Sequence, residues 1–165
     1  MIEKAISNVT SSEVFHTLVV LGSYRDEILA VISNLPVSYY YNENYRDGML
    51  SSVQCGFKNL PEECEAVLVF PGDQPFIETE VVNLIIEKYR TTGKGIIIPV
   101  YRKKRGHPIL IDIKYREAVY NLPDDEGLRY LSYRYRRDVY EVKTSSMGIL
   151  KDFNTKDDYL NEINK

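Results

Sequence analysis

A single aspartate follows the most distinctive apolar stretch of the chain. Ala66–Phe70 is a short run rich in β-branched residues, typical of a strand buried on both faces, and Pro71 and Gly72 end it. Open α/β sheets bind ligands just past the carboxyl ends of their central strands. Asp73 is therefore placed to hold a hard cation such as Mg²⁺, which prefers oxygen ligands. The alternative is that Asp73 only forms an Asx-turn with its own backbone.

A second polar patch, N-Y-R-D-G-M-L-S-S, covers Asn44–Ser52 and leads into an expected helix. Backbone amides and hydroxyl groups at a helix N-terminus can face an anion or a nucleotide. Gly48, Ser51 and Ser52 are accordingly candidates for nucleotide binding. Plain N-terminal capping by the two serines is the alternative.

A third patch, R-G-H-P-I-L, runs from Arg105 to Leu110. Gly106 would let the backbone approach a flat ligand closely. His107 could donate to a phosphate, or remain a hydrogen-bonded strand histidine. The preceding basic residues of the tetrad 102–105 could form a solvated hairpin tip, or could attract an anionic substrate.

The fourth patch, D-F-N-T-K-D-D, begins at Asp152. Asp152 and Asn154 offer oxygen ligands, or simply close a turn before the last helix. Thr155 starts that helix, and Asp158 three residues later completes a capping box.

Together, the segment P-G-D-Q-P-F and the three patches described after it resemble the MobA/MocA-like nucleotidyltransferase family. The resemblance implies transfer of CMP or GMP from CTP or GTP to the phosphate of molybdopterin, in molybdenum cofactor biosynthesis, and the motifs favour the cytidylyl kind. It implies Asp73 and Asn154 as catalytic residues that hold Mg²⁺, with Asp152 as a helper. It also implies that Gly48, Ser51 and Ser52 contact the nucleotide. The residues implied to contact the pterin substrate are Gln74, Pro75, Arg105, Gly106, His107 and Pro108.

Size and composition are consistent with such an enzyme. The 165 residues predict one nucleotidyltransferase-like domain, and the net charge of -3 argues against nucleic acid as the main partner. The chain has no apolar run long enough for a membrane span and no secretory signal pattern at its start. Cys55 and Cys64 are expected to be reduced thiols of a cytoplasmic protein.

The elements that must position these residues alternate between strands and helices. Strands are expected at 17–21, 37–41, 66–70, 95–101, 107–112, 139–142 and 148–150. Helices are expected around 2–9, 28–32, 50–57, 81–88, 113–122 and 128–136 and from 155 onward, with an acidic loop at 123–127. The pattern predicts a three-layer α/β/α sandwich with a mainly parallel, Rossmann-like sheet.

The resemblance also exposes a difference. The family opens with a strand and a glycine-rich loop that holds the triphosphate, and this sequence has neither. That strand would lie between Thr17–Leu21 and Ala66–Phe70, which must pair with each other, leave a gap or recruit another chain. The expected consequences are poor or absent triphosphate binding, with possible loss of activity, and a tendency to form homo-oligomers. Gly22-Ser23 could be a substitute anion-binding turn or a simple turn.

Two other functions remain open. One is a non-catalytic relative that binds molybdopterin or a partner protein through the Arg105–Pro108 side of the cleft. The other is an enzyme of the same fold that acts on a sugar phosphate.

Overall fold

A computed structural model describes residues 1–123 and 126–164, apart from the side chain of residue 156. The helices are α1 (Ile2–Thr10), α2 (Arg25–Ile32), α3 (Met49–Lys58), α4 (Thr79–Thr92), α5 (Arg116–Tyr120), α6 (Arg129–Arg134) and α7 (Lys156–Ile163). The strands are β1 (Leu18–Leu21), β2 (Ser38–Tyr41), β3 (Ala66–Val69), β4 (Ile96–Tyr101), β5 (Lys104–Arg105), β6 (Ile109–Asp112) and β7 (Val139–Lys143). Short 3₁₀ turns are η1 (Tyr45–Asp47), η2 (Ile113–Tyr115), η3 (Arg136–Asp138) and η4 (Met147–Leu150).

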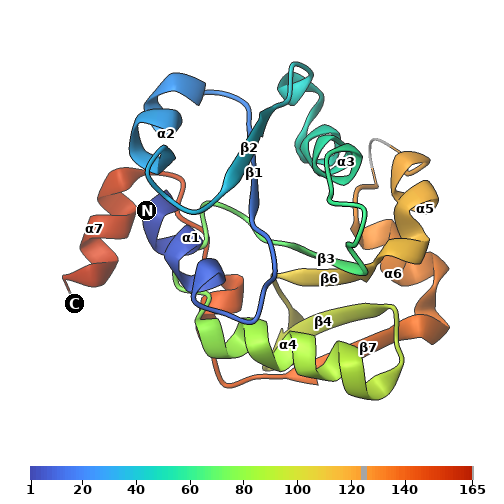
Figure 1. Ribbon diagram of the computed structural model, residues 1–165. Helices are drawn as coiled ribbons and strands as arrows, with labels where there is room; N and C mark the ends of the chain where they lie inside the picture. Colours follow the sequence, from blue (N-terminus) through green and yellow to red (C-terminus); the bar gives the residue numbers. More distant parts are fainter. Residues whose placement is uncertain (124–125, 165) are drawn as a thin grey trace.

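The strands form two sheets (Figure 1). β1 pairs in parallel with β2, and the larger sheet has the order β3-β6-β4-β5, with β7 parallel to β4. β6 runs antiparallel to both β3 and β4, so the larger sheet is mixed. The expected α/β fold is confirmed. The larger sheet contains more antiparallel pairing than expected, because β6 lies between β3 and β4 and runs antiparallel to both.

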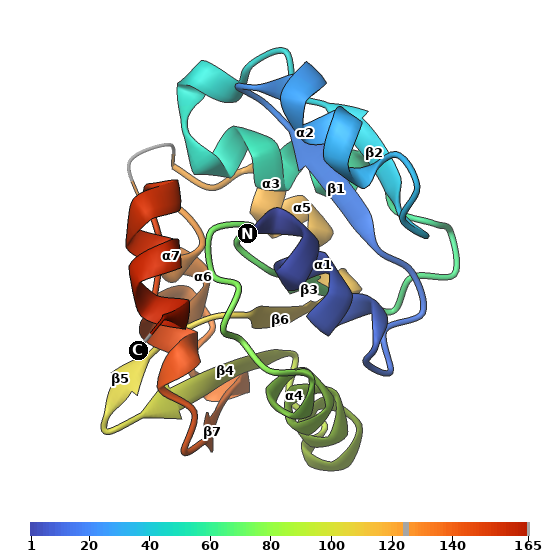
Figure 2. The same ribbon diagram turned by 90° about the vertical axis from the view of Figure 1, so that its left-hand side faces the viewer.

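Side chains of the larger sheet alternate between two helical layers, as the period of a strand requires. Ile96 and Ile98 pack with α3, α5 and α6, whereas Ile97 between them packs with α4. A third, smaller core joins α1 and α2 to the β1-β2 sheet. Figure 2 shows α1 and α2 beside β1 and β2, and α4 beside β4 of the larger sheet. This is the expected three-layer arrangement.

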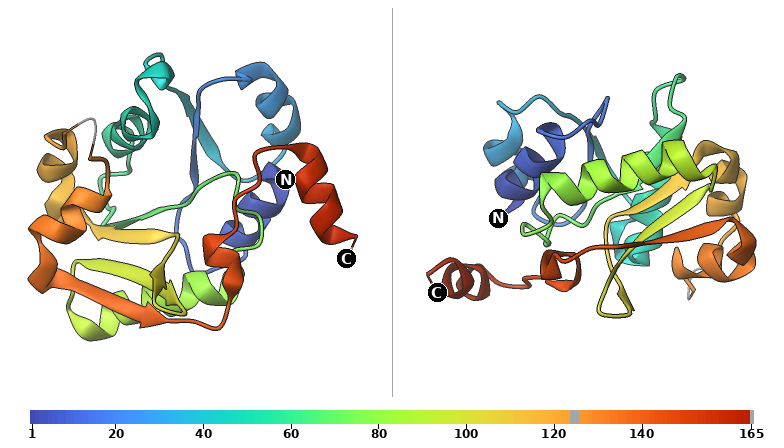
Figure 3. Two further views of the ribbon diagram at one scale, coloured as in Figure 1. Left: turned by 180° about the vertical axis from the view of Figure 1, so that it is seen from behind. Right: turned by 90° about the horizontal axis from the view of Figure 1, so that it is seen from below.

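The final helix lies at the periphery. In both views of Figure 3, α7 extends from the body of the protein near the C-terminus. The Thr155 hydroxyl accepts a hydrogen bond from the Asp158 amide at 3.1 Å, which confirms the expected cap. Gly93 ends α4 in the left-handed conformation, which glycine adopts readily.

One expected strand is wrong. Residues 148–150 belong to the 3₁₀ turn η4, in which the Lys151 amide donates to the Gly148 carbonyl at 3.2 Å. Gly148 lies so close to the Phe76 backbone that any side chain at this position would overlap the Phe76 carbonyl. The apolar run at 148–150 is short enough to form either a strand or a turn. The close approach of the Phe76 backbone to Gly148 favours the turn. The acidic loop expected at 123–127 lies partly outside the described residues.

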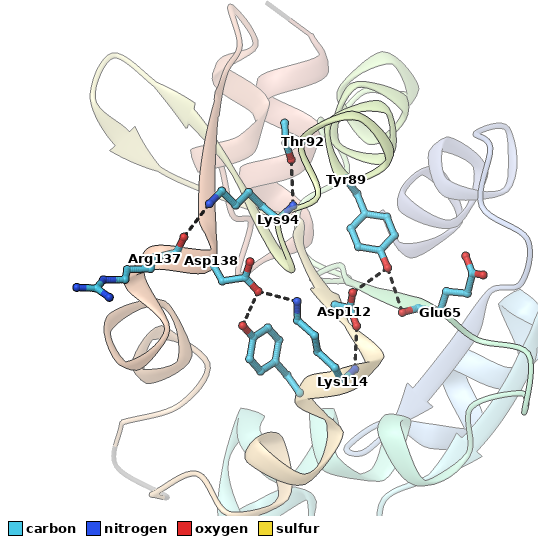
Figure 4. Close-up of polar contacts among 9 residues, drawn as sticks. Glu65, Tyr89, Thr92, Lys94, Asp112, Lys114, Arg137 and Asp138 are labelled. Carbon is cyan, nitrogen blue, oxygen red and sulfur yellow. Dashed lines mark hydrogen bonds and ion pairs between the residues drawn. The ribbon is translucent and has the colours of Figure 1, made fainter.

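A polar network closes the amino-terminal end of β3, opposite the end that carries Asp73 (Figure 4). Asp112 accepts hydrogen bonds from the Tyr89 hydroxyl at 3.0 Å and from the Lys114 amide at 2.8 Å. Asp138 accepts from the Lys114 ammonium group at 2.8 Å and from a neighbouring tyrosine. Burial and the bond to Asp112 raise the pKa of Tyr89 to about 12. These side chains supply hydrogen-bond partners to one another, so we assign a structural role to the network at the amino-terminal end of β3.

Candidate active site

Asp73 lies just beyond the carboxyl end of β3, as the sequence predicts. It is half-buried, and the turn around it is closed by a backbone bond in which the Gln74 amide donates to the Pro71 carbonyl at 3.3 Å. Among the side chains that the structure describes, none forms a hydrogen bond or ion pair with the Asp73 carboxylate. The Asx-turn alternative therefore finds no support, and the carboxylate is available to a ligand.

The last patch meets this turn directly. The Phe153 amide donates to the Asp73 carbonyl at 3.0 Å, although the two residues are far apart in sequence. Phe153 is buried and packs against Phe76, with ring centroids 5.2 Å apart. Its neighbours Asp152 and Asn154 are both exposed. The fold thus brings the segment with Asp152 and Asn154 alongside Asp73.

The donor atoms in this region fit a divalent cation that keeps much of its own water. No group of three His, Cys, Asp or Glu residues with ligating geometry occurs within residues 1–123 and 126–164. Two or three oxygens from Asp73, Asn154 and Asp152 would suit Mg²⁺, which commonly takes few protein ligands and fills its other positions with water and substrate phosphate.

His107 lies beside the same turn. Its amide donates to the Ile149 carbonyl at 3.0 Å, and the peptide bond to Pro108 is cis. The Nδ1 atom is buried and has no hydrogen-bond partner among the described residues. Burial lowers the pKa of His107, and the nearby Asp73 carboxylate opposes that shift. Burial therefore favours the neutral imidazole at pH 7.

The two residues before His107 make contacts elsewhere in the protein. The Arg105 guanidinium donates to the Glu141 carboxylate at 2.7 Å and to the Ser132 hydroxyl at 3.1 Å. Gly106 packs against the Ile149 carbonyl, where a side chain would overlap that oxygen. Arg105 and His107 both line a cavity of about 390 Å³ whose floor is formed by isoleucines of β4 and β6.

The polar patch before α3 forms hydrogen bonds within its own loop. The Asn42 amide group donates to the Ser51 hydroxyl at 2.8 Å and to the Ser52 hydroxyl at 3.0 Å. The Ser51 hydroxyl lies 2.8 Å from the carbonyls of Gly48 and Asn44. Neither serine makes a side-chain N-cap of α3, because Gly48 itself occupies that position. Gly48 has φ of 97°, a conformation that favours glycine.

Gln74 and Pro75, which follow Asp73 in the chain, are both buried. A residue that sequence reasoning missed is bound to this segment. Asn8 of α1 donates through its side-chain amide to the Pro75 carbonyl at 3.0 Å and to the Ile77 carbonyl at 2.8 Å. The local sequence of an amphipathic helix does not indicate which distant backbone groups a buried asparagine will bind.

The Gly22-Ser23 turn packs against the loop that leads into α3. A Cβ atom at Gly22 would lie 2.8 Å from the Tyr45 Cβ, so the tyrosine covers the glycine.

Comparison with known proteins identifies the family. The model of the MobA-like NTP transferase domain matches residues 1–139. The chain belongs to the MobA-like NTP transferase domain family. A search of curated proteins found no match.

Solved structures show the same fold. A manganese complex of Rv0371c from Mycobacterium tuberculosis superposes with a TM-score of 0.84 at 19% identity, covering 99% of this chain and 86% of that one. A nucleotidyl transferase from Methanothermobacter thermautotrophicus gives 0.79 at 19% identity, with 98% and 77% covered. CMP:2-keto-3-deoxy-manno-octonic acid synthetase complexed with CTP gives 0.72 at 10% identity, with 98% and 85% covered.

Membership of the MobA-like NTP transferase family makes this protein a nucleotidyltransferase. None of the described helices combines the length and apolarity that a membrane crossing requires.

Proposed function

We propose that this nucleotidyltransferase moves CMP, or GMP, from the nucleoside triphosphate to the phosphate of molybdopterin. A phosphate oxygen of the pterin attacks the α-phosphorus, the bond from that phosphorus to the bridging oxygen of the β-phosphate breaks, and pyrophosphate leaves. The observation that carries the proposal is the bond between the Phe153 amide and the Asp73 carbonyl at 3.0 Å. It joins the two segments that hold the proposed catalytic residues, Asp73 and Asn154.

Phosphoryl-type transfers ask a protein for alignment and charge neutralisation more than for covalent chemistry. Asp73 and Asn154 would hold Mg²⁺, with Asp152 as a further oxygen ligand. When bound, the cation would neutralise charge on the phosphates. The manganese complex of a structural neighbour supports a divalent metal in this fold.

The cavity beside His107 is the proposed place for the pterin. His107 would contribute a ring nitrogen, and Arg105 would contribute positive charge at the rim. Gly106 and Pro108 would shape the wall, with Gln74 and Pro75 supporting it from behind. Gly48, Ser51 and Ser52 would shape the loop that faces the nucleotide. The CTP complex of a structural neighbour supports a cytidine nucleotide, and homo-oligomer formation stays a prediction.

The test is pyrophosphate release from CTP or GTP in the presence of molybdopterin and Mg²⁺, at millimolar nucleotide because weak binding is expected. The wild-type chain should release pyrophosphate and Asp73→Ala should not. Asp26→Ala is the matched control, since Asp26 is an exposed carboxylate on α2 whose ion-pair partner is the adjacent Arg25. Pterin binding by the wild type without pyrophosphate release would overturn the proposal and favour a non-catalytic relative.

A further inference from the structure

The cavity beside His107 has the size and lining of a small-molecule site. Its volume is about 390 Å³, and such sites commonly measure roughly 300–1,000 Å³. Its floor is apolar, because β4 and β6 both contribute isoleucines to it. We call it the His107 cavity, and its floor residues are Ile96, Ile98, Ile109 and Ile111.

An exposed aromatic side chain forms part of the wall of the His107 cavity. Tyr133 of α6 lines the cavity and is 63% exposed. Among the described residues, none makes a hydrogen bond or a ring contact with Tyr133. A large ring left in water forgoes the stabilisation that burial would provide, so a flat ligand placed against Tyr133 would gain from covering it.

Ser132, the residue before Tyr133, connects α6 to Arg105. Ser132 is 5% exposed, and its hydroxyl donates to the Arg129 carbonyl at 2.8 Å. Since a hydroxyl has a single hydrogen, the bond that Arg105 donates at 3.1 Å goes to a lone pair of the same oxygen. Ser132 therefore fixes the position of one terminal nitrogen, Nη1, of the guanidinium.

Glu141 on β7 holds another edge of the same guanidinium. Its Oε1 atom lies 2.7 Å from Nε and 2.7 Å from Nη2 of Arg105. The N–H groups of Arg105 that remain lie on its two terminal nitrogens. A pair of such donors can bind two oxygens of a carboxylate or a phosphate at once.

Arg105 differs from the other charged residues that line the His107 cavity. Glu126 and Arg129 are both exposed and carry opposite charges. Among the described lining residues, only Arg105 is a cation held in place by hydrogen bonds to two other elements. A donor that is already fixed loses less conformational freedom when an anion binds.

We propose that α6 selects the acceptor of the transfer reaction: Tyr133 stacks on a flat ring in the His107 cavity, and Ser132 is a positioning residue that aims Arg105 at an anionic group on that ring. The inference rests on the proposed function for the identity of this acceptor as a pterin. The chemical class of the ligand, a flat ring that bears an anion, follows from the cavity itself.

The test is equilibrium binding of two fluorescent probes at pH 7, without nucleotide or Mg²⁺. Pterin-6-carboxylate has the flat ring and an anion, whereas pterin has the ring alone. The wild-type chain should bind the carboxylated probe about tenfold more tightly than pterin, because the anion gains charge-assisted hydrogen bonds from Arg105.

Variants of Tyr133 test the stacking. Tyr133→Leu keeps an apolar side chain without the ring and should weaken the binding of both probes by about tenfold. Tyr133→Phe keeps the ring and should bind both probes like the wild type. Tyr39→Leu is the matched control, because Tyr39 is 51% exposed but lies on β2, away from the lining of the His107 cavity.

Variants of Ser132 and Arg105 test the positioning. Ser132→Ala should weaken the binding of pterin-6-carboxylate by about fivefold and leave that of pterin unchanged. Arg105→Gln should also reduce the preference for the carboxylated probe. Adding Ser132→Ala to Arg105→Gln should have no further effect, because Ser132 acts through Arg105.

Four results would overturn the proposal. They are no saturable binding of pterin-6-carboxylate to the wild type at millimolar probe, equal binding by Tyr133→Leu and Tyr133→Phe, equal loss of both probes in a Ser132→Ala variant with the wild-type circular dichroism spectrum, or additive effects of Ser132→Ala and Arg105→Gln. Because neither probe requires CTP or turnover, pyrophosphate release tests the proposed function separately.

Discussion

Asn8 links the first helix to the turn that carries Asp73, and its removal has a predictable cost. The residue is 8% exposed and donates to two backbone carbonyls, those of Pro75 and Ile77, at 3.0 and 2.8 Å. Asn8→Ala would leave both carbonyls without this donor in a buried environment. Each unsatisfied buried group costs about 1–3 kcal/mol, so we expect the free energy of unfolding to fall by about 2–4 kcal/mol.

The assay is urea unfolding followed by circular dichroism, with the denaturant slope checked for two-state behaviour. Asn59→Ala is the matched control. The Asn59 side chain donates only to the Cys55 carbonyl of its own helix at 2.9 Å, and Asn59 is partly exposed. Its loss should cost about 1 kcal/mol or less. Equal losses for the two variants would refute the structural role assigned to Asn8.

Three further outcomes follow from contacts described above. Gly148→Ala should destabilise the fold by about 2 kcal/mol or more in urea unfolding, because the new Cβ atom would overlap the Phe76 carbonyl, whereas Gly56→Ala within a helix should not. Burial lowers the pKa of His107, so the unfolded state binds a proton first, and stability should fall as pH drops below about 6.5, a dependence that His107→Gln should reduce. Burial alone would raise the pKa of Asp138, but its hydrogen bonds to Lys114 and Tyr115 outweigh burial and lower it below the ordinary value of 3.8. Asp138→Asn should therefore lose stability at pH 7, and the difference from wild type should shrink as pH falls below 3.8.

Much of the fold was predictable because its signals are local. The spacing of Ile2, Ala5, Ile6 and Val9 marks α1, and the strand-helix alternation predicts the layers. Gly93 and Thr155 mark helix ends through local backbone and hydrogen-bonding preferences. The position of Asp73 was also predictable, since a short apolar strand followed by Pro-Gly places the next residue at the strand's end.

What could not be predicted depends on contacts between distant segments. The partners of Asn8 are close to seventy residues away, and Gly148 forms a turn only because the Phe76 backbone reaches it. The expected burial of the strand at 66–70 on both faces is likewise wrong, because every residue of β3 is only half-buried. The capping alternative for Ser51 and Ser52 is wrong, because Gly48 occupies the N-cap position and the two hydroxyls bond instead to Asn42 in the loop before α3.

The measurement that tests the central claim most directly is the location of bound Mn²⁺ by paramagnetic broadening in NMR. Mn²⁺ stands in for Mg²⁺ and reports on nearby amides without any catalytic turnover. The account predicts selective loss of the amide signals of Gly72, Asp73, Phe153 and Asn154 in the wild-type chain, and their retention in Asp73→Ala. Broadening centred on other residues, or the same broadening in Asp73→Ala, would contradict it.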